Sequence, residues 1–209
     1  MPERALSPPP AEWRRSYLLA RAREGRLLPD GLVAALPALP PAHPLSAEWA
    51  QRADSARRLL AHLARRPRPL RVVDLGCGCG WLSARIADLP TTHVTGVDAT
   101  AEELAQARRV FGDRRNLRFV EADLTTVDLR AGDVVVLASV LQYLAAPAEL
   151  LRRWLSEVGA AGEVHVLDSP IYRAEHVDAA RARTAAHYAS IGVPEMAARY
   201  HHHTWREHD

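Results

Sequence analysis

The sequence predicts an α/β domain built on a doubly wound, mostly parallel sheet. Short apolar runs alternate with helix-compatible segments from about residue 71 to residue 168, the pattern of a parallel sheet with helices on both faces. Three successive apolar runs also end at or next to an acid, which predicts polar side chains along one edge of the sheet. With 209 residues, 48% of them hydrophobic, the chain is long enough for one domain with a substantial core.

The chain ahead of the sheet is predicted to form a helical and proline-rich cap segment, residues 1–45, before a main domain that spans residues 46–209. Trp13 and Tyr17 lie in a stretch that suits a short helix. Prolines crowd residues 29–44 and predict an irregular connector there.

A longer helix is expected from Ser46, a candidate N-cap, to about Arg66. Its apolar face carries Trp49. Pro67 is expected to end this helix before the first strand, because proline disfavours helical backbone in the residue that precedes it.

The most informative stretch runs from Val72 to Gly80, where an apolar strand contains Asp74 near its end. Three glycines follow at alternate positions: Gly76, Gly78 and Gly80. Because glycine has no Cβ, such a turn lets the backbone approach a neighbouring group closely. A strand, a glycine turn and a helix N-terminus together form a nucleotide-type site with exposed N–H groups. The dinucleotide fingerprint G-x-G-x-x-G fails, since its third glycine is replaced by Trp81.

The next two strands also end near acids. The second strand, Val94–Asp98, is followed by Thr100 and, three residues later, Glu103, a capping-box pattern for the next helix. The third strand is expected over Leu117–Leu124, with Asp123 near its end.

The fourth strand, Asp133–Ser139, is almost entirely apolar, and Pro147 suits the first turn of the helix after it. Glu163–Asp168 is the fifth strand. Beyond it, residues 170–189 have a helical pattern and residues 200–205 supply at most one further strand.

From Asp74 the chain reads Asp-x-Gly-x-Gly-x-Gly, and Asp98 and Asp123 stand at the tips of the next two strands. Over roughly half of the chain this arrangement resembles the class I (Rossmann-like) S-adenosylmethionine-dependent methyltransferase family. The resemblance implies S-adenosyl-L-methionine as the cofactor and S-adenosyl-L-homocysteine as its product. It also implies methyl transfer to a small-molecule acceptor, at an O, N or C nucleophile, by in-line displacement.

The resemblance further implies which residues hold the cofactor. These are Asp74, Gly76, Cys77, Gly78, Gly80, Asp98, Ala99, Asp123, Leu124, Ala138, Ser139 and Arg52. Asp98 is assigned to the ribose hydroxyls and Asp123 to the adenine edge. Arg52 is assigned to the methionine carboxylate, because a guanidinium fork fits a carboxylate.

The end of the fourth strand bears on the acceptor. Residues 138–143 read Ala-Ser-Val-Leu-Gln-Tyr. Members of the family that methylate amide or exocyclic amino nitrogens commonly have Asn or Asp followed by Pro-Pro-aromatic here, so this chain looks more like the small-molecule enzymes. Tyr143 is a candidate for orienting the acceptor, with plain packing on the sheet as the alternative.

His201 and His203 lie in a run of three histidines and are candidate general bases, because histidine titrates near neutral pH. Together with Tyr143 they are the expected catalytic residues. Three successive histidines cannot all point one way, and Cys77 and Cys79 alone are too few ligands, so no metal is expected.

Composition limits the partners. All 27 basic residues are arginine and the net charge is only +2, so no nucleic-acid partner is expected. No apolar run approaches the ~20 residues of a membrane span, and no signal-peptide core is present, so we expect a cytoplasmic protein without a membrane partner.

The family's complete sheet has seven strands, whereas little chain follows Asp168, so the C-terminal end is expected to be shortened. An unpaired sheet edge is a liability unless it is covered. A homodimer, a partner subunit or the N-terminal segment is expected to cover it.

Two alternative functions stay open on the sequence. One is a module that binds S-adenosylmethionine without turnover. The other is an RNA or protein methyltransferase, which a continuous basic face beside the pocket would support. A nicotinamide-dependent dehydrogenase is the least favoured, because Trp81 breaks its fingerprint.

Overall fold

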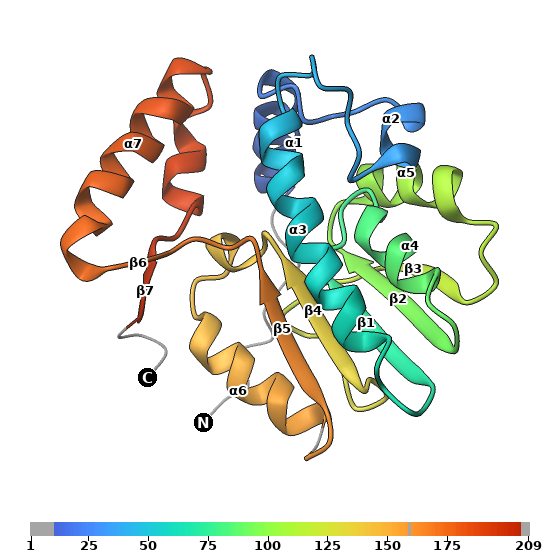
Figure 1. Ribbon diagram of the computed structural model, residues 1–209. Helices are drawn as coiled ribbons and strands as arrows, with labels where there is room; N and C mark the ends of the chain where they lie inside the picture. The colour runs from blue at the N-terminus through green and yellow to red at the C-terminus, as the bar shows by residue number, and fades with distance from the viewer. Residues whose placement is uncertain (1–10, 159, 206–209) are drawn as a thin grey trace.

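A computed structural model describes residues 11–158 and 160–205 of the chain (Figure 1). Its centre is a parallel five-stranded sheet in the order β3-β2-β1-β4-β5. The strands are β1 (Leu70–Leu75), β2 (Thr92–Asp98), β3 (Leu117–Glu121), β4 (Val134–Ala138) and β5 (Glu163–Leu167). Each strand predicted from the sequence is present, with small shifts at its ends, and the predicted doubly wound α/β fold is confirmed.

Seven α-helices surround the sheet within the described ranges. They are α1 (Ala11–Arg23), α2 (Asp30–Ala35), α3 (Ser46–Leu63), α4 (Trp81–Ala87), α5 (Ala101–Phe111), α6 (Pro147–Val158) and α7 (Val177–Ser190). Three short 3-10 helices add η1 (Leu141–Tyr143), η2 (Ala174–His176) and η3 (Pro194–Arg199). None of the helices in the part of the chain that the structure describes has the length and apolar character to cross a membrane.

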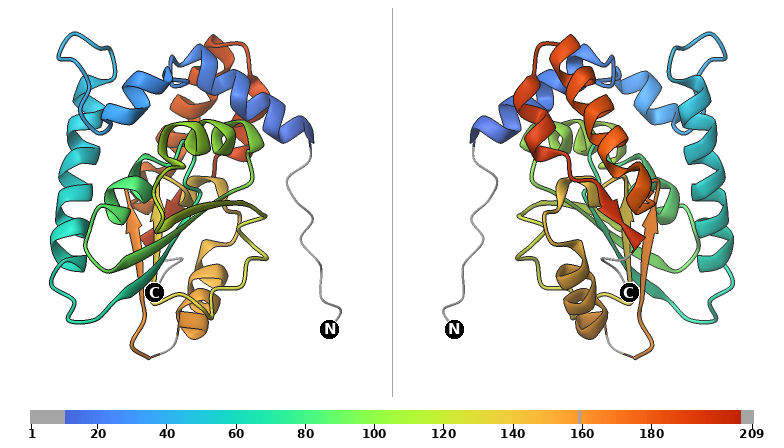
Figure 2. Two further views of the ribbon diagram at one scale, coloured as in Figure 1. Left: turned by 90° about the vertical axis from the view of Figure 1, so that its right-hand side faces the viewer. Right: turned by 90° about the vertical axis from the view of Figure 1, so that its left-hand side faces the viewer.

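The sheet is apolar on both faces, which is why both are covered by helices. Val72 and Val136 belong to the cluster packed against α3 and α4, while Val135 and Leu137 belong to the cluster packed against α6. The interior strand β4 is therefore an uninterrupted apolar run, as expected for a strand buried on both faces. Figure 2 shows α3 and α6 on opposite faces of the sheet.

The cap over the carboxyl ends of the strands comes from both ends of the chain. Ala20 of α1 packs with Tyr188 of α7 and with Val193 and Met196 beside and within η3, forming a third apolar cluster. Figures 1 and 2 show α1, α2 and α7 gathered beyond one end of the sheet. The cap is thus wider than the predicted segment 1–45, of which residues 1–10 lie outside the described range.

Two expected helix caps are wrong. Leu45, not Ser46, precedes α3, and the Ser46 hydroxyl donates to the Pro41 carbonyl at 3.2 Å. Thr100 does precede α5, but its side chain caps no helical N–H. The Glu103 carboxylate faces Arg21 of α1, because the burial of this charge under the cap demands a partner there.

The two segments with the weakest patterns also differ from expectation. The connector over residues 29–44 contains the short helix α2. Beyond the fifth strand the helix begins only at Val177, because residues 171–172 form β6 and pair in parallel with β7 at residues 203–204. Within the described ranges the main sheet has five strands.

Trp154 of α6 provides a test of the packing on the α6 face. Its side chain is fully buried, whereas the adjacent Leu155 is 49% exposed. Trp154→Ala is expected to lower the free energy of unfolding by about 3–5 kcal/mol, through lost apolar burial and a residual cavity. Leu155→Ala, the matched control, should cost less than about 1 kcal/mol. Urea unfolding of both variants measures this, and equal losses would contradict the described packing.

Candidate functional site

The glycine turn after β1 is held by backbone bonds to β2. The N–H groups of Gly76 and Cys77 both donate to the carbonyl of Val97, at 2.7 and 3.1 Å. Gly76, Gly78 and Gly80 have φ values of 73°, 52° and 76°, in the left-handed region that favours glycine. The alternating glycines are therefore required by the backbone conformation itself.

The same glycines also make room for side chains of this protein. A Cβ on Gly76 would lie 2.5 Å from Val140, and one on Gly80 would lie 2.6 Å from Phe119. A Cβ on Gly78 would lie 3.2 Å from a carboxylate oxygen of Glu103. The sequence predicts that the backbone of the turn closely approaches a neighbouring group. At these three glycines that group is a packed side chain of the protein.

Asp98, at the end of β2, ties the turn to the next helix. Its two carboxylate oxygens accept the N–H of Gly78 and the N–H of Thr100, each at 2.8 Å. Burial raises the pKa of Asp98 from its ordinary value, although these backbone N–H groups oppose the shift. Asp98 therefore acts as a clamp that fixes the turn after β1 against the start of α5.

Asp74 is the most deeply buried acid of the site, with 1% of its surface exposed. It accepts a hydrogen bond from the Ser83 hydroxyl at 2.6 Å. Burial raises the pKa of Asp74 to about 6, with Ser83 opposing the shift and the Asp98 charge adding to it. The hydrogen-bond partners of this carboxyl group are thus the hydroxyl and the backbone of Ser83.

Glu103 of α5 is a third buried acid beside the glycine turn. Its carboxylate lies 3.8 Å from the Arg21 guanidinium and accepts a long hydrogen bond of 3.5 Å from the Tyr17 hydroxyl. Burial raises the pKa of Glu103 to about 7, while Arg21 lowers it and Asp98 raises it. The cap helix α1 thus contacts the binding edge of the sheet through this carboxylate.

These groups border a cavity of about 290 Å³ between the carboxyl ends of the strands and the cap. Its lining contains more carboxylates than guanidinium groups. The acids are Glu24, Glu48, Asp74, Glu103 and Asp168, and the bases are Arg21, Arg26 and Arg52. A ligand with positive charge would therefore compensate the excess of carboxylates in the cavity lining.

The arginines of the cavity are already paired. Arg26 forms two hydrogen bonds with the Glu48 carboxylate, at 2.6 and 2.7 Å. Arg52 contacts the same carboxylate at 2.9 Å and lies over the Trp49 ring at 5.1 Å from its centroid. Glu48 thus holds two guanidinium groups at the rim of the cavity.

The carboxyl ends of β4 and β5 have strained backbone. Ser139 and Asp168 have φ values of 60° and 51°, conformations that cost a non-glycine residue about 1–3 kcal/mol. The Ser139 hydroxyl donates to the Asp168 carbonyl at 3.1 Å and bridges the two strand ends. Beside them, the side-chain oxygen of Gln142 is buried without a hydrogen-bond partner and belongs to a residue of the cavity wall.

Aromatic side chains close the cavity on the cap side. Trp13 stacks on Tyr17 at a centroid distance of 5.2 Å, and Tyr17 meets Tyr143 edge-on at 5.6 Å. Tyr143 also meets Tyr200 edge-on at 6.0 Å. Both ends of the chain thus pack around Tyr143, and their rings exclude water from this side.

Comparison with known proteins identifies the family. The sequence profile of a family described as "Methyltransferase domain" matches residues 72–162, the segment that contains the glycine turn and strands β1 to β4. The segment of residues 72–162 is therefore a methyltransferase domain of the class I, S-adenosylmethionine-dependent type.

Curated proteins with a related sequence match this chain over part of their length. It is 32% identical over 126 residues to a trans-aconitate 2-methyltransferase of Streptomyces avermitilis, covering 55% of this chain and 47% of the relative. It is 36% identical over 78 residues to a malonyl-[acyl-carrier protein] O-methyltransferase of Legionella pneumophila, covering 36% and 28%. The matched region thus spans about half the length, or less, of these relatives.

Solved structures share the fold. The plantazolicin methyltransferase BpumL, solved with a triazolic desmethylPZN analog and SAH, has a TM-score of 0.54 and 19% identity, covering 89% of this chain and 70% of that one. The YcgJ protein from Bacillus subtilis has a TM-score of 0.52 and 16% identity, covering 66% and 68%. At these identities the likeness is one of fold.

Most of the residues of the turn and of β4 that were predicted to bind the cofactor line this cavity. Asp74, Gly76, Cys77, Gly78, Ala138, Ser139, Arg52 and Tyr143 all line it. Gly80, Asp98, Ala99, Asp123 and Leu124 are not among its lining residues. Asp123 instead accepts the N–H and the hydroxyl of Thr125, at 2.8 and 2.7 Å.

The two predicted catalytic histidines lie elsewhere. His201 and His203 line a second cavity, next to the start of α6. The backbone N–H of His201 donates to the Gln142 carbonyl at 2.7 Å, and Nε2 of His203 bonds the Leu141 carbonyl at 2.9 Å. The structure therefore does not bring them together with Tyr143 in the first cavity.

Sequence reasoning missed Arg21 and Glu103 as residues of the cavity. One signal was available for Glu103: it precedes Ala107 and Phe111 by one and two turns, on the buried face of α5. An acid on an apolar helix face is rarely buried without a purpose. Arg21 gave no such signal, because its contact with Glu103 depends on how the cap folds over the sheet.

The raised pKa of Asp74 makes stability depend on pH. An acid with a higher pKa in the folded than in the unfolded chain binds more protons when folded, so its contribution to stability falls as pH rises. For Asp74 the window lies between the ordinary value of 3.8 and about 6. Asp74→Asn removes this loss and keeps an acceptor for Ser83.

Relative to the wild type, Asp74→Asn should therefore gain about 1–2 kcal/mol more unfolding free energy near pH 7.5 than near pH 4.5. Urea unfolding at the two pH values checks the difference. A difference between variant and wild type that does not change with pH would rule out a raised pKa at Asp74.

Proposed function

We propose that this protein transfers the methyl group of S-adenosyl-L-methionine to a small-molecule acceptor and releases S-adenosyl-L-homocysteine. The observation that carries the proposal is the cavity at the carboxyl edge of the sheet, bordered by the glycine turn and by buried carboxylates that lack a full set of cations. The match of residues 72–162 to a methyltransferase domain supports the same function.

The cavity suits this cofactor on electrostatic grounds. S-adenosyl-L-methionine carries a sulfonium and an α-ammonium group, and the lining has five carboxylates for three guanidinium groups. Asp74 is the natural partner for the ammonium group, because its carboxyl group is buried in the wall of the cavity and burial raises its pKa, which a nearby cation would lower. Arg52, which shares Glu48 with Arg26, is the partner proposed for the methionine carboxylate.

The adenosine part of the cofactor is proposed to bind next to the cavity, at the ends of β2 and β3. We propose that Asp98 binds the ribose hydroxyls while it holds the glycine turn, and that Ala99 lies under the adenine. Asp123 and Leu124 are proposed to meet the adenine edge. The Asp123 carboxylate then keeps its hydrogen bonds with Thr125, since a carboxylate has acceptor sites for several donors.

The chain contributes alignment and exclusion of water to the reaction. The activated methyl group is supplied by the cofactor, and positioning of the acceptor behind it can be worth roughly 7–11 kcal/mol. Ala138 and Ser139 line the wall at the end of β4, where the methyl group is proposed to point. Among the three predicted catalytic residues, Tyr143 is proposed to orient the acceptor, because it lines this cavity.

A small acceptor is favoured over RNA or a protein. The cavity lies under aromatic rings of the cap, and its arginines are paired with glutamates rather than displayed as a basic surface. The names of the curated relatives mention trans-aconitate and malonyl-[acyl-carrier protein]. Trans-aconitate and other small carboxylic acids are the first acceptors to screen, followed by malonyl-[acyl-carrier protein], whose malonyl group is small although a protein carries it.

Methyl transfer is the direct test of the function. The purified chain is incubated with S-adenosyl-L-methionine and each acceptor, and mass spectrometry follows the methylated product and S-adenosyl-L-homocysteine together. Equal formation of both supports the proposal. Tight cofactor binding with no product from any acceptor class would favour the alternative of a binding module without turnover. Product only from RNA or from the side chains of a protein would overturn the small-molecule assignment.

The cover of the outer sheet edge is a separate proposal. Val166 of β5 is 38% exposed at this edge, and we propose a homodimer or a partner subunit there. The division into a cap of residues 1–45 and a main domain likewise stays a proposal.

Asp98 gives the sharpest mutational prediction for the cofactor. Asp98→Asn should weaken binding of S-adenosyl-L-homocysteine by about 1–3 kcal/mol, or roughly 5- to 150-fold, because hydrogen bonds to a charged acceptor are lost. Asp178→Asn is the matched control, since the Asp178 side chain is 96% exposed on α7. Calorimetry measures both, and wild-type affinity in a folded Asp98→Asn variant would refute the ribose assignment.

A further inference from the structure

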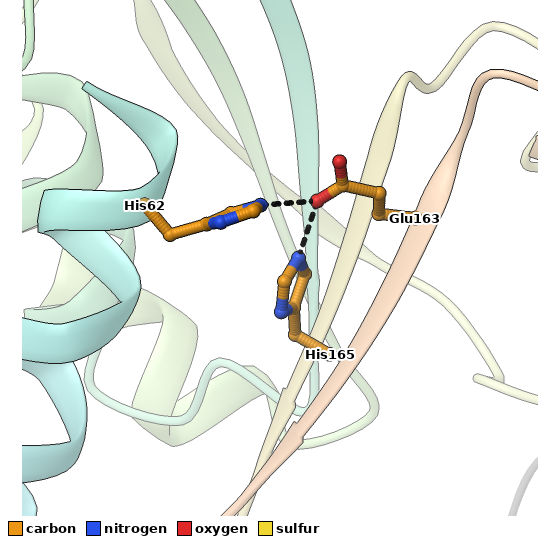
Figure 3. Close-up of side chains that lie close together, drawn as sticks. All are labelled: His62, Glu163 and His165. Carbon is orange, nitrogen blue, oxygen red and sulfur yellow. Dashed lines mark hydrogen bonds and ion pairs between the residues drawn. The ribbon is translucent and has the colours of Figure 1, made fainter. Parts of the chain in front are cut away.

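A second group of chemically suited side chains lies outside the lining of the cavity, where α3 meets the edge strand β5. His62 is in the last turn of α3, and Glu163 and His165 belong to β5. Residues two apart on a strand point to the same face, so both β5 side chains face α3. Figure 3 shows the two imidazole rings converging on the carboxylate.

The three ligand atoms are already close together. Nε2 of His62 and Nε2 of His165 lie 2.7 and 2.8 Å from the same carboxylate oxygen of Glu163, Oε2. All three side chains offer ligand atoms within 4.8 Å of one another. Zinc bonds of ~2.0–2.1 Å in tetrahedral geometry place neighbouring ligand atoms about 3.4 Å apart. The ion takes the place of the Nε2 protons, each neutral ring keeping its one proton on Nδ1. Shifts of less than about 1 Å would then admit the ion without turning either ring over.

We propose that His62, Glu163 and His165 bind a divalent transition metal ion of the zinc type. Two imidazole nitrogens and one carboxylate form a donor set that suits zinc and its neighbours, whereas magnesium and calcium prefer oxygen ligands alone. The side chains are 45%, 23% and 26% exposed, so solvent reaches the site and water completes the coordination.

The surroundings of Glu163 support an ionised ligand. Arg66 supplies a positive charge beside its carboxylate. Arg66 contacts the other carboxylate oxygen, Oε1, at 2.5 Å and so leaves Oε2 for the metal. Such a partner on the far oxygen orients a ligating carboxylate.

The consequence of binding is mechanical. His62 and Glu163 are 101 residues apart in the chain, and a shared ion would fasten the end of α3 to the outermost strand of the sheet. None of the three residues lines the proposed cofactor cavity. The ion is therefore assigned a stabilising role, separate from methyl transfer.

The test counts zinc ions per chain. Protein stripped with a chelator is titrated with Zn²⁺ against a chromophoric competitor, for the wild type, the double variant His62→Gln/His165→Gln, and the control His93→Gln. His93 is an exposed histidine on β2, outside the cluster. Any zinc bound by the run His201–His203 contributes equally to the count in all three proteins, so the difference between them reports only on the cluster.

The wild type and His93→Gln are expected to bind one zinc ion more than the double variant does. Zn²⁺, but not Mg²⁺, should also raise the melting temperature of these two proteins and not that of the double variant. Glu163→Gln should weaken zinc binding by at least about 10-fold, since even the loss of a partner of a ligand costs about 10- to 100-fold.

Equal zinc stoichiometry and affinity in the wild type and the double variant would overturn the proposal. If the double variant does not fold, His62→Gln alone replaces it, because the His62 side chain is the most exposed of the three. Unchanged zinc binding in that single variant would overturn the proposal equally.

Discussion

Three buried carboxylates converge on the turn after β1, and the rest of the site depends on how their charge is balanced. Asp74, Asp98 and Glu103 all have raised pKa values, with burial as the main cause. Burying a charge costs free energy unless it is paired, and the pairing here is partial. A hydroxyl serves Asp74, backbone N–H groups serve Asp98, and a guanidinium group at 3.8 Å serves Glu103.

The excess of negative charge beside the glycine turn indicates which kind of ligand binds there. The turn places Gly76 to Gly78 beside the acids, where N–H groups and carboxylates meet in one small volume. A ligand with cationic groups and hydroxyls satisfies such an edge, whereas an anionic ligand does not. That physical requirement supports S-adenosyl-L-methionine independently of the family likeness, because the two cations of this cofactor lie at its methionine end.

The cap, which is formed by segments near both ends of the chain, covers the cavity and contacts Glu103. Tyr17 and Arg21 of α1 reach Glu103, while Tyr188 of α7 and Tyr200 pack around the same rings. The N-terminal and C-terminal segments therefore form one cover rather than two independent appendages. Opening of this cover would expose Glu103 to water and lower its pKa, so access to the cavity and the charge of Glu103 are coupled.

Local patterns in the sequence were sufficient for the sheet, because apolar runs, glycines with positive φ and strand-end acids act within a few residues. They were insufficient where distant contacts decide. Thr100 and Glu103 have the spacing of a capping box, yet Arg21 and Tyr17 determine where the Glu103 carboxylate points.

The same distinction explains the histidines. His201 and His203 resemble candidate bases in the sequence, but the pairing of β6 with β7 places them beside α6. The cluster of His62, Glu163 and His165 had no signal in the sequence, because α3 and β5 meet only in the folded chain. Element identity is thus encoded locally here, whereas the composition of each site depends on packing.

The most direct measurement is the proton release that accompanies binding of S-adenosyl-L-methionine near pH 6. If the cofactor's ammonium group pairs with Asp74, the pKa of that carboxyl group, about 6 in the free protein, must fall on binding. Calorimetry in buffers of different ionisation enthalpy should then detect release of protons near pH 6, little release near pH 8, and a smaller release in Asp74→Asn. Binding without proton release at pH 6, or the same release in Asp74→Asn, would contradict the account of this cavity as a receptor for cations.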